Sequence, residues 1–204
     1  MIKDFWDERY SQAEFVYGTE PNDFLKAEAS RLPLGRVLCL AEGQGRNAVY
    51  LATLGYDVWA VDQSAVGLAK AHELAAANGV TIRTEVANLE SFEISPAAWD
   101  GIVSFSAHLP PTVRQNIHRQ VVAGLKPGGG IILEAYTVAQ LESSGVGGPP
   151  PTQKELYMSL AALKEELSGL EFEIGREIER DVNEGVAHWG RSAVVQVVAT
   201  KPLA

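Results

Sequence analysis

Residues 37–48 constrain the fold more than any other part of the chain. They begin with Val-Leu-Cys-Leu, an apolar run without alternation, which is typical of a parallel strand buried on both faces. Gly43 and Gly45 follow, where they allow a tight turn and leave no Cβ between the backbone and a ligand. The next apolar residues have helical spacing and end at Gly55. This stretch therefore predicts a strand, a glycine turn and a helix.

A second strand and an acid extend this unit. Residues 58–61 are apolar and lead into Asp62, roughly 20 residues past the glycine turn. An acid at the tip of the second strand is placed to bind the two hydroxyls of a ribose. We therefore predict a site for an adenosine-containing cofactor at this turn.

Composition limits the kind of protein that this chain can be. Its 204 residues suit one domain, and a hydrophobic fraction of 46% is enough for a sizeable core. The net charge of −9 disfavours a nucleic-acid partner, because phosphates need a basic surface. No stretch reaches the ~20 apolar residues of a membrane span, and the N-terminus lacks an apolar signal-peptide core. We expect a cytoplasmic protein, monomeric or homodimeric, with no membrane contact.

The cysteine and histidine pattern indicates neither a disulfide nor a metal. Cys39 is the single cysteine and lies in the first buried strand, where a thiol is more often inert packing than a nucleophile. No Cys/His cluster has metal-ligand spacing, so we expect no metal.

The rest of the chain continues as alternating strands and helices and then a hairpin. The expected further strands are 80–86, 99–105, 131–136, 170–182 and 187–200, and the expected helices are 24–32, 65–77, 110–125 and 153–167. Ser64 is a good N-cap for the second of these helices. Asn183-Glu184-Gly185 supplies turn residues between the last two strands, which predicts an antiparallel pair.

We assign residues 1–204 to one domain with four parts. These are N-terminal helices and a flap (1–35), a cofactor-binding core (36–136), a loop that is either a linker or a lid (137–152), and a helix with the terminal hairpin (153–204). The flap prediction depends on the aromatic, glycine- and proline-containing segment 15–22. Its rings either pack in the ordinary way or exclude water from a reactive group.

The glycine turn by itself does not select the cofactor. Gly43, Gly45 and Ala48 also satisfy the dinucleotide pattern G-x-G-x-x-A. Glu42 would put a carboxylate beside a dinucleotide pyrophosphate, and like charges ~4 Å apart cost about 4 kcal/mol at an effective dielectric constant of 20. S-adenosylmethionine carries an ammonium and a sulfonium and no phosphate, so Glu42 favours it over a nicotinamide dinucleotide.

Nearly the whole chain resembles a class I S-adenosylmethionine-dependent methyltransferase, and within that superfamily the small tellurite-resistance-type and thiopurine-type group. The segments that carry the resemblance are 5–10, 17–22, the turn 42–47, Asp62, the Leu-Lys-Pro-Gly-Gly stretch at 125–129 and the closing hairpin. The more usual turn of the superfamily has an acid at the place of Cys39, whereas here the acid is Glu42.

The resemblance implies an α/β fold, a three-layer Rossmann-like sandwich. Its seven-stranded, mostly parallel sheet would have the order 3-2-1-4-5-7-6 with strand 7 antiparallel. It implies that the glycines approach the methionine moiety, that Asp62 binds the ribose and that Asn88 and Leu89 flank the adenine. The candidate cofactor-binding residues are Trp6, Tyr17, Glu42, Gly43, Gly45, Asn47, Asp62, Gln63, Asn88, Leu89 and Phe105.

The predicted reaction is in-line transfer of the sulfonium methyl group to a small molecule, namely a thiol, a chalcogen anion or a small heterocycle. The candidate general bases are His108 and Tyr136, each with a structural role as the alternative. The candidate substrate-binding residues are these two with His188 and Arg191, which lie near the start of the last strand. Two other functions stay open: an NAD(P)-dependent oxidoreductase, because of the glycine spacing, and a non-catalytic cofactor-binding protein, because no catalytic residue is evident.

Overall fold

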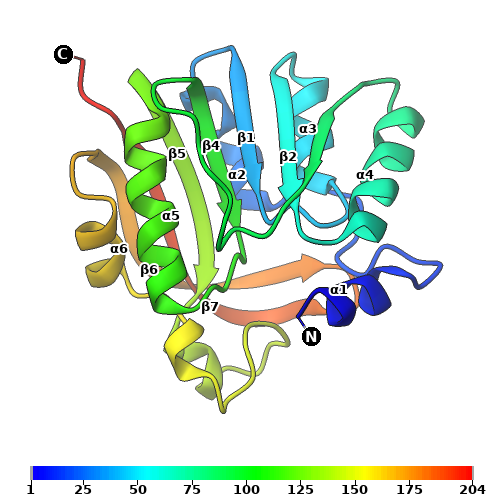
Figure 1. Ribbon diagram of the computed structural model, residues 1–204. Coiled ribbons are helices and arrows are strands. Elements are labelled where there is room, and N and C mark those ends of the chain that lie inside the picture. The colour runs from blue at the N-terminus through cyan, green and yellow to red at the C-terminus, as the bar shows by residue number, and fades with distance from the viewer. Residues whose placement is uncertain (1, 204) are drawn as a thin grey trace.

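The strand predicted before the glycine turn lies at the centre of the sheet. The computed structural model describes residues 2–203, and its seven strands have the order β3-β2-β1-β4-β5-β7-β6 (Figure 1). The strands are β1 (Arg36–Leu40), β2 (Asp57–Asp62), β3 (Arg83–Val86), β4 (Trp99–Phe105), β5 (Leu125–Tyr136), β6 (Glu171–Glu184) and β7 (His188–Thr200). Strand β7 is antiparallel to β5, and β1 to β5 are parallel. The predicted strand order and the antiparallel seventh strand are confirmed.

Helices cover both faces of this sheet. They are α1 (Ile2–Tyr10), α2 (Asp23–Glu28), α3 (Arg46–Thr53), α4 (Ala65–Ala77), α5 (Pro111–Gly124) and α6 (Leu160–Glu166), with short 3₁₀ turns at Ala29–Arg31, Val138–Glu142 and Lys154–Leu156. Alternate residues of β1 face opposite cores. Val37 and Cys39 pack with α2, α3 and α4, whereas Leu38 and Leu40 pack with α5 and α6. Both faces of β1 are thus buried, which explains its apolar run without alternation.

Polar caps set where several helices begin. The Ser64 side chain accepts a hydrogen bond from the Gly67 N–H, and Asn22 accepts from the N–H groups of Phe24 and Leu25. These caps satisfy backbone donors that have no partner inside the helix. The prediction at Ser64 is therefore confirmed.

One predicted helix is shorter than expected. The sequence suggested residues 153–167, but α6 begins only at Leu160, because the Ser159 side chain caps it by accepting from the Ala162 N–H. The preceding residues are extended instead, and the Met158 N–H donates to the Tyr136 carbonyl. The apolar spacing that suggested one long helix is thus shared between a 3₁₀ turn and α6.

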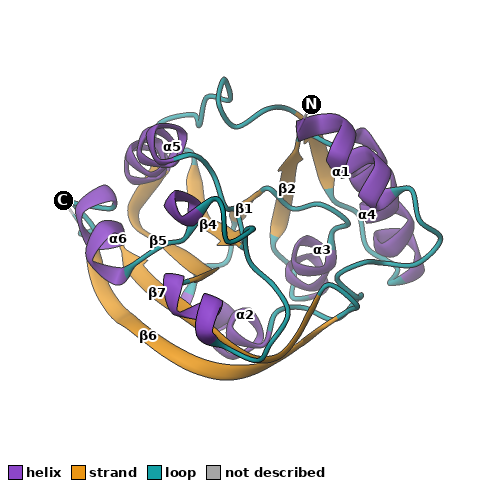
Figure 2. Ribbon diagram, turned by 90° about the horizontal axis from the view of Figure 1, so that it is seen from below, coloured by secondary structure: helices purple, strands orange, loops and turns teal. Residues whose placement is uncertain are grey.

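The terminal hairpin continues past the end of the sheet. Strand β5 stops pairing at Tyr136, opposite Val194, while β6 and β7 remain paired as far as Glu184 and His188. Figures 1 and 2 show that this free end curves beneath the carboxyl ends of the parallel strands toward α1. The loop 137–152 lies against it through a bridge between Val146 and Trp189.

No helix in residues 2–203 is both long enough and apolar enough to cross a membrane.

Gly45 gives a direct test of why the turn requires glycine. Its φ is +89°, and a Cβ there would lie 2.4 Å from the Cβ of Ala71. We expect Gly45→Ala to lower the free energy of unfolding by about 2–4 kcal/mol, from steric overlap and the left-handed backbone. Gly55 is the matched control, since its φ is +92° and nothing lies within 4 Å of its Cβ position. Gly55→Ala should cost only about 1 kcal/mol in the same urea titration. Equal losses in the two variants would contradict the steric explanation.

Candidate functional site

The candidate site lies at the carboxyl ends of β1 and β4. Strand β1 is hydrogen-bonded to β2 on one side and to β4 on the other, so the strand order reverses there. This is the place where open α/β sheets bind ligands. Each of these two strands is followed by a left-handed residue other than glycine, Ala41 with φ 51° and Ser106 with φ 53°. Such strained backbone is concentrated at functional sites.

Asp62 ends β2 and is held by the two turns that flank it. Its Oδ2 accepts a hydrogen bond from the Gly43 N–H and its Oδ1 from the Ser64 N–H, both at 2.8 Å. The residue is only 6% exposed, and this burial raises the pKa of its carboxyl group. The carboxylate is therefore fixed in orientation beside the glycine turn.

Glu42 fills the place at the start of α3 where a phosphate would bind. Its Oε1 accepts hydrogen bonds from the N–H groups of Asn47 at 3.0 Å and Ala48 at 2.8 Å. Burial raises the pKa of Glu42 to about 7. A pyrophosphate would have to displace this carboxylate from the helix N-terminus. The turn thus fits a cofactor that carries positive charge and no phosphate.

An N-terminal tyrosine lies directly on the glycine turn. A Cβ at Gly43 would be 2.6 Å from the Tyr10 hydroxyl oxygen, and one at Gly67 would be 2.8 Å from the same ring. Trp6 stacks on Tyr10 with 5.5 Å between ring centroids. Helix α1 therefore contacts the glycine turn through Tyr10, which the sequence analysis did not single out as a site residue.

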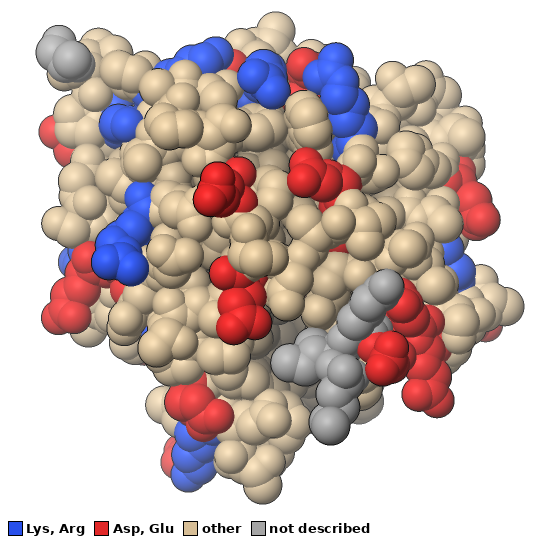
Figure 3. All heavy atoms as spheres, viewed as in Figure 1, with Lys and Arg blue, Asp and Glu red and all other residues tan. Residues whose placement is uncertain are grey.

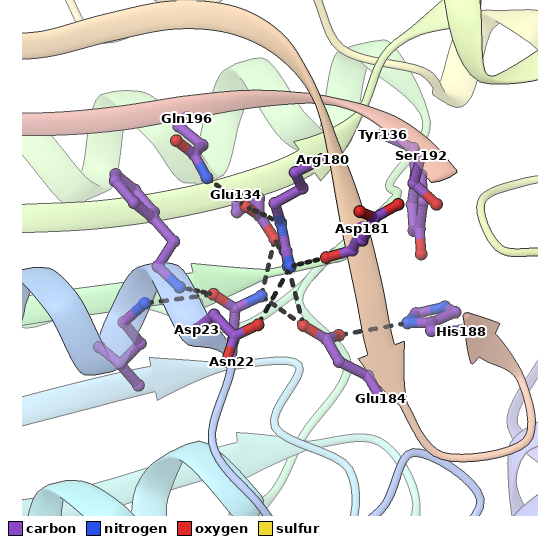
Figure 4. Close-up of polar contacts among 12 residues, drawn as sticks. Asn22, Asp23, Glu134, Tyr136, Arg180, Asp181, Glu184, His188, Ser192 and Gln196 are labelled. Carbon is purple, nitrogen blue, oxygen red and sulfur yellow. Dashed lines mark hydrogen bonds and ion pairs between the residues drawn. The ribbon is translucent and has the colours of Figure 1, made fainter. Parts of the chain in front are cut away.

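A buried cluster of charged side chains joins the N-terminal segment to the hairpin. It consists of Asn22, Arg46, Glu134, Arg180 and Glu184, and we call it the charge cluster. Figure 4 labels four of these residues, namely Asn22, Glu134, Arg180 and Glu184. The Asn22 amide donates to Glu134 Oε1 and to Glu184 Oε1, both at 2.7 Å. Two carboxylates and two guanidinium groups meet there, so the cluster is electrically neutral.

The ion pairs of the charge cluster have short contacts. Arg180 Nη2 lies 2.6 Å from Glu134 Oε1 and 3.0 Å from Glu184 Oε1. Arg46 Nη2 donates to Glu184 Oε2 at 2.6 Å. Although burial opposes ionisation, the His188 ring and the Arg46 guanidinium hold the pKa of Glu184 well below its usual range. Glu184 is therefore a carboxylate at neutral pH.

Aromatic and imidazole rings line the space next to this cluster. His188 lies between Tyr17 and Tyr136, with centroid distances of 4.6 Å and 5.2 Å. Tyr17 in turn lies 6.4 Å from Tyr10. The rings thus form a continuous row from the glycine turn to the start of β7.

The structure gives the two histidines near this row different surroundings. His108 Nδ1 lies 3.0 Å from the Leu156 carbonyl oxygen, and its Nε2 accepts from the Tyr136 N–H at 3.5 Å. Burial lowers the pKa of His108 to about 4. Both of its ring nitrogens therefore have structural partners. His188 is different, because its Nδ1 is buried without a hydrogen bond, 3.7 Å from Glu184 Oε2.

Most of the predicted cofactor residues come together at this edge of the sheet. Glu42, Gly43 and Gly45 lie in the turn, Asp62 accepts from the Gly43 N–H, and Asn47 accepts a hydrogen bond from the Asn22 N–H at 2.9 Å. Gln63, Asn88 and Leu89 lie on the segments that follow β2 and β3, and Phe105 is the last residue of β4.

Two of the predicted residues have local roles in the structure. Asn88 is exposed, and its Oδ1 accepts from the Glu90 N–H at 3.0 Å, as in a turn. Arg191 has a half-exposed side chain and pairs with Glu179 at 3.2 Å, so it does not join the rings around His188.

Among residues 2–203, no group of three or more His, Cys, Asp or Glu side chains is placed to hold a metal ion.

Comparison with known families agrees with this geometry. Residues 37–129 match the model of the family described as a methyltransferase domain. This segment contains the glycine turn, Asp62, all of β1 but its first residue, and the strands β2 to β4. A comparison with curated proteins finds no match.

Solved structures share the fold at low sequence identity. One is that reported for the conversion of a disulfide bond into a thioacetal group during echinomycin biosynthesis, with a TM-score of 0.75, 18% identity, and coverage of 99% of this chain and 92% of that chain. The 4+2 cyclase SpnF has a TM-score of 0.70 and 16% identity, with 100% and 96% covered. TehB from Haemophilus influenzae has a TM-score of 0.65 and 22% identity, with 98% and 66% covered.

The turn chemistry, the strand order and the family match agree. Glu42 and Asp62 suit a cationic adenosine cofactor, and the sheet has the order expected for the superfamily. Residues 37–129 thus match the model of a methyltransferase domain, and nearly the whole chain shares its fold with the solved structures named above.

Proposed function

We propose that the protein methylates a small molecule whose nucleophile is a thiol, a chalcogen anion or a small heterocycle. The proposed methyl donor is S-adenosylmethionine. When bound, it would supply the electrophilic methyl group, and the protein would supply position and a dry site. Gly43, Gly45 and Asp62 would hold the cofactor, with Tyr10 and Trp6 against it. The net charge of −9 supports a small-molecule acceptor over a nucleic acid. Acidic and basic side chains are interspersed on the face in Figure 3, and no continuous basic patch covers that face.

The observation that carries the proposal is the position of His188. It lies between two tyrosine rings at one end of the row that begins on the glycine turn. Its Nδ1 faces the ionised Glu184, so Nε2, on the opposite edge of the ring, is free to accept a proton. Burial lowers the pKa of His188, so the ring is neutral at pH 7.

This arrangement gives His188 a role that depends on the acceptor. A protonated thiol or heterocycle would transfer its proton to Nε2 as the methyl group moves, and Glu184 would stabilise the resulting imidazolium. An acceptor that is already an anion needs no base. Arg46 and Arg180 keep Glu184 charged for this purpose.

The two other functions make different predictions in a binding experiment. An oxidoreductase would bind NADH, but Glu42 occupies the phosphate position at α3. A non-catalytic protein would bind S-adenosylmethionine and turn over no acceptor. Calorimetric titration with S-adenosylmethionine, S-adenosylhomocysteine and NADH, followed by a screen of thiol, chalcogen and heterocycle acceptors, separates all three.

Asp62→Ala tests the proposed cofactor site. We expect this variant to bind S-adenosylmethionine about 10- to 150-fold more weakly, because a charge-assisted hydrogen bond to the ribose is worth about 1.5–3 kcal/mol. Asp57→Ala is the matched control, since Asp57 lies at the other end of the same strand and pairs with Arg83 at the surface. Its affinity should stay within twofold of the wild type by calorimetry. An unchanged affinity in Asp62→Ala would refute the ribose assignment.

His188→Gln tests the acceptor site. We expect kcat/KM for a thiol or heterocycle acceptor to fall about 100-fold or more, while the affinity for S-adenosylmethionine changes less than threefold. Since the pKa of His188 is lowered, the wild-type rate should be insensitive to this group above pH 7 and should fall in acid, as the ring becomes protonated. His72→Gln is the control, because His72 is exposed on α4 and contacts Thr84. A pH profile that is unchanged in His188→Gln would exclude His188 as the base.

A further inference from the structure

One arginine at the His188 end of the ring row has no acidic partner. Arg9, on α1, donates from Nη1 to the Tyr17 hydroxyl at 2.8 Å, and Tyr17 packs on His188. The two arginines of the charge cluster are each paired with a glutamate, whereas Arg9 forms no ion pair with an acidic side chain of residues 4–203. Since the charge cluster is neutral, Arg9 adds a positive charge that this cluster does not compensate.

The Arg9 guanidinium group is held in place with most of its donors unused. Its Cζ atom lies over the ring of Phe5, 4.9 Å from the centroid, and over that of Trp6, at 5.6 Å. These ring contacts orient the group without taking up its five N–H donors, and within residues 4–203 only Tyr17 accepts a hydrogen bond from it. The residue is half-buried, so the other donors can meet a ligand.

The Tyr17 hydroxyl provides a further donor at the same place. Burial raises the pKa of Tyr17, so the phenol is protonated at pH 7. Because its oxygen accepts from Arg9, its proton points elsewhere, and no group in the described part of the chain accepts it. A guanidinium N–H beside a phenol O–H matches the two oxygens of a carboxylate. The pair therefore has the chemistry of a carboxylate site.

The Arg9 side chain is directed toward His188, away from the glycine turn. Successive residues of a helix point about 100° apart, and the next residue, Tyr10, is the one that lies on Gly43. Burial is the main cause that lowers the pKa of His188, and the positive charge of Arg9 contributes to the same shift. A carboxylate held by Arg9 would thus lie beside the ring that is proposed to accept the proton.

We propose that Arg9 and Tyr17 bind a carboxylate group of the acceptor, so that the acceptor is a small organic acid. Its thiol or heterocyclic nucleophile lies close to this carboxylate in the same molecule. The carboxylate compensates the charge of Arg9 and turns the nucleophile toward His188. This inference rests on the proposed function, because it selects the acid-bearing members of the thiols and heterocycles named there.

Matched pairs of acceptors test the carboxylate. The probes are mercaptoacetate and 2-mercaptobenzoate, each compared with its methyl ester, which keeps the thiol and lacks the negative charge. Calorimetric titration of the S-adenosylhomocysteine complex measures their binding without turnover. In at least one pair we expect the acid to bind about 10-fold more tightly than its ester, or better, and to have the lower KM in methyl transfer. No preference for the acid in either pair would overturn the proposal.

Arg9→Met tests whether the preference comes from this residue. We expect KM for the acid to rise about 10- to 100-fold, whereas kcat, KM for the ester and the affinity for S-adenosylmethionine change less than about threefold. Arg9→Lys should restore part of the preference, because it keeps the charge and loses the planar fork of donors. Tyr17→Phe should weaken binding of the acid about 3- to 10-fold, since it removes the hydroxyl and keeps the ring on His188.

Arg191→Met is the matched control for the loss of an arginine. Arg191 is the arginine that the sequence suggested for substrate binding, but its half-exposed side chain pairs with Glu179 outside the ring row. Its removal should leave the preference for the acid unchanged, and a loss as large as that in Arg9→Met would overturn the assignment to Arg9.

The remaining outcomes separate this inference from the proposed function. A preference for the acid that persists in Arg9→Met would overturn the role of Arg9. If Arg9→Met weakened S-adenosylmethionine as much as the acid, Arg9 would belong to the carboxylate of the cofactor's methionine moiety, which would also overturn the proposal. Binding of the acid through Arg9 with no methyl transfer to any acceptor would refute the proposed function and leave the carboxylate site in place.

Discussion

The rest of the site depends on one buried electrostatic arrangement, the charge cluster around Asn22. Removing one partner from a buried ion pair typically costs about 3–5 kcal/mol, because the other charge is left without compensation. Here Glu184 is shared by Arg46 and Arg180, and Asn22 joins it to Glu134. The cluster therefore fixes three segments relative to one another: the start of α2, the start of α3 and the free end of the hairpin. The rings around His188 take their positions from it.

The parts of the fold that were predictable from sequence depend on short stretches of chain. A buried parallel strand has an uninterrupted apolar run in its sequence, and a left-handed turn favours glycine. Ser64 is a residue type that commonly caps helices, and it caps α4. The strand order, by contrast, came from the resemblance to a family. The predicted helix at residues 153–167 was too long for a local reason as well. Apolar spacing does not show that Ser159 caps the helix, so that α6 begins only at Leu160.

The charge cluster was not predictable because its partners are far apart in the chain. Asn22 and Glu134 are 112 residues apart, and Asn22 and Glu184 are 162 apart. From sequence, Glu134 is a polar residue in a strand and Glu184 a turn residue, and neither pattern indicates a buried ion pair. The sequence did place Arg46 near the candidate site, since this residue directly follows Gly45 in the turn. Its ion pair with Glu184 could not be predicted, because the sequence does not show that β6 extends past the end of β5.

The two parts of the candidate site are held in place by different segments of the chain. Glu42 and Asp62 are held by backbone N–H groups of the turn itself, so their positions depend on few other side chains. His188 and Tyr136 depend instead on the hairpin end and on the loop that bridges to it. Sequence change in the hairpin and loop can therefore reshape the proposed acceptor site without disturbing the glycine turn. A fold shared with a 4+2 cyclase and with TehB is consistent with this division, since the reaction is set by the site and not by the sheet.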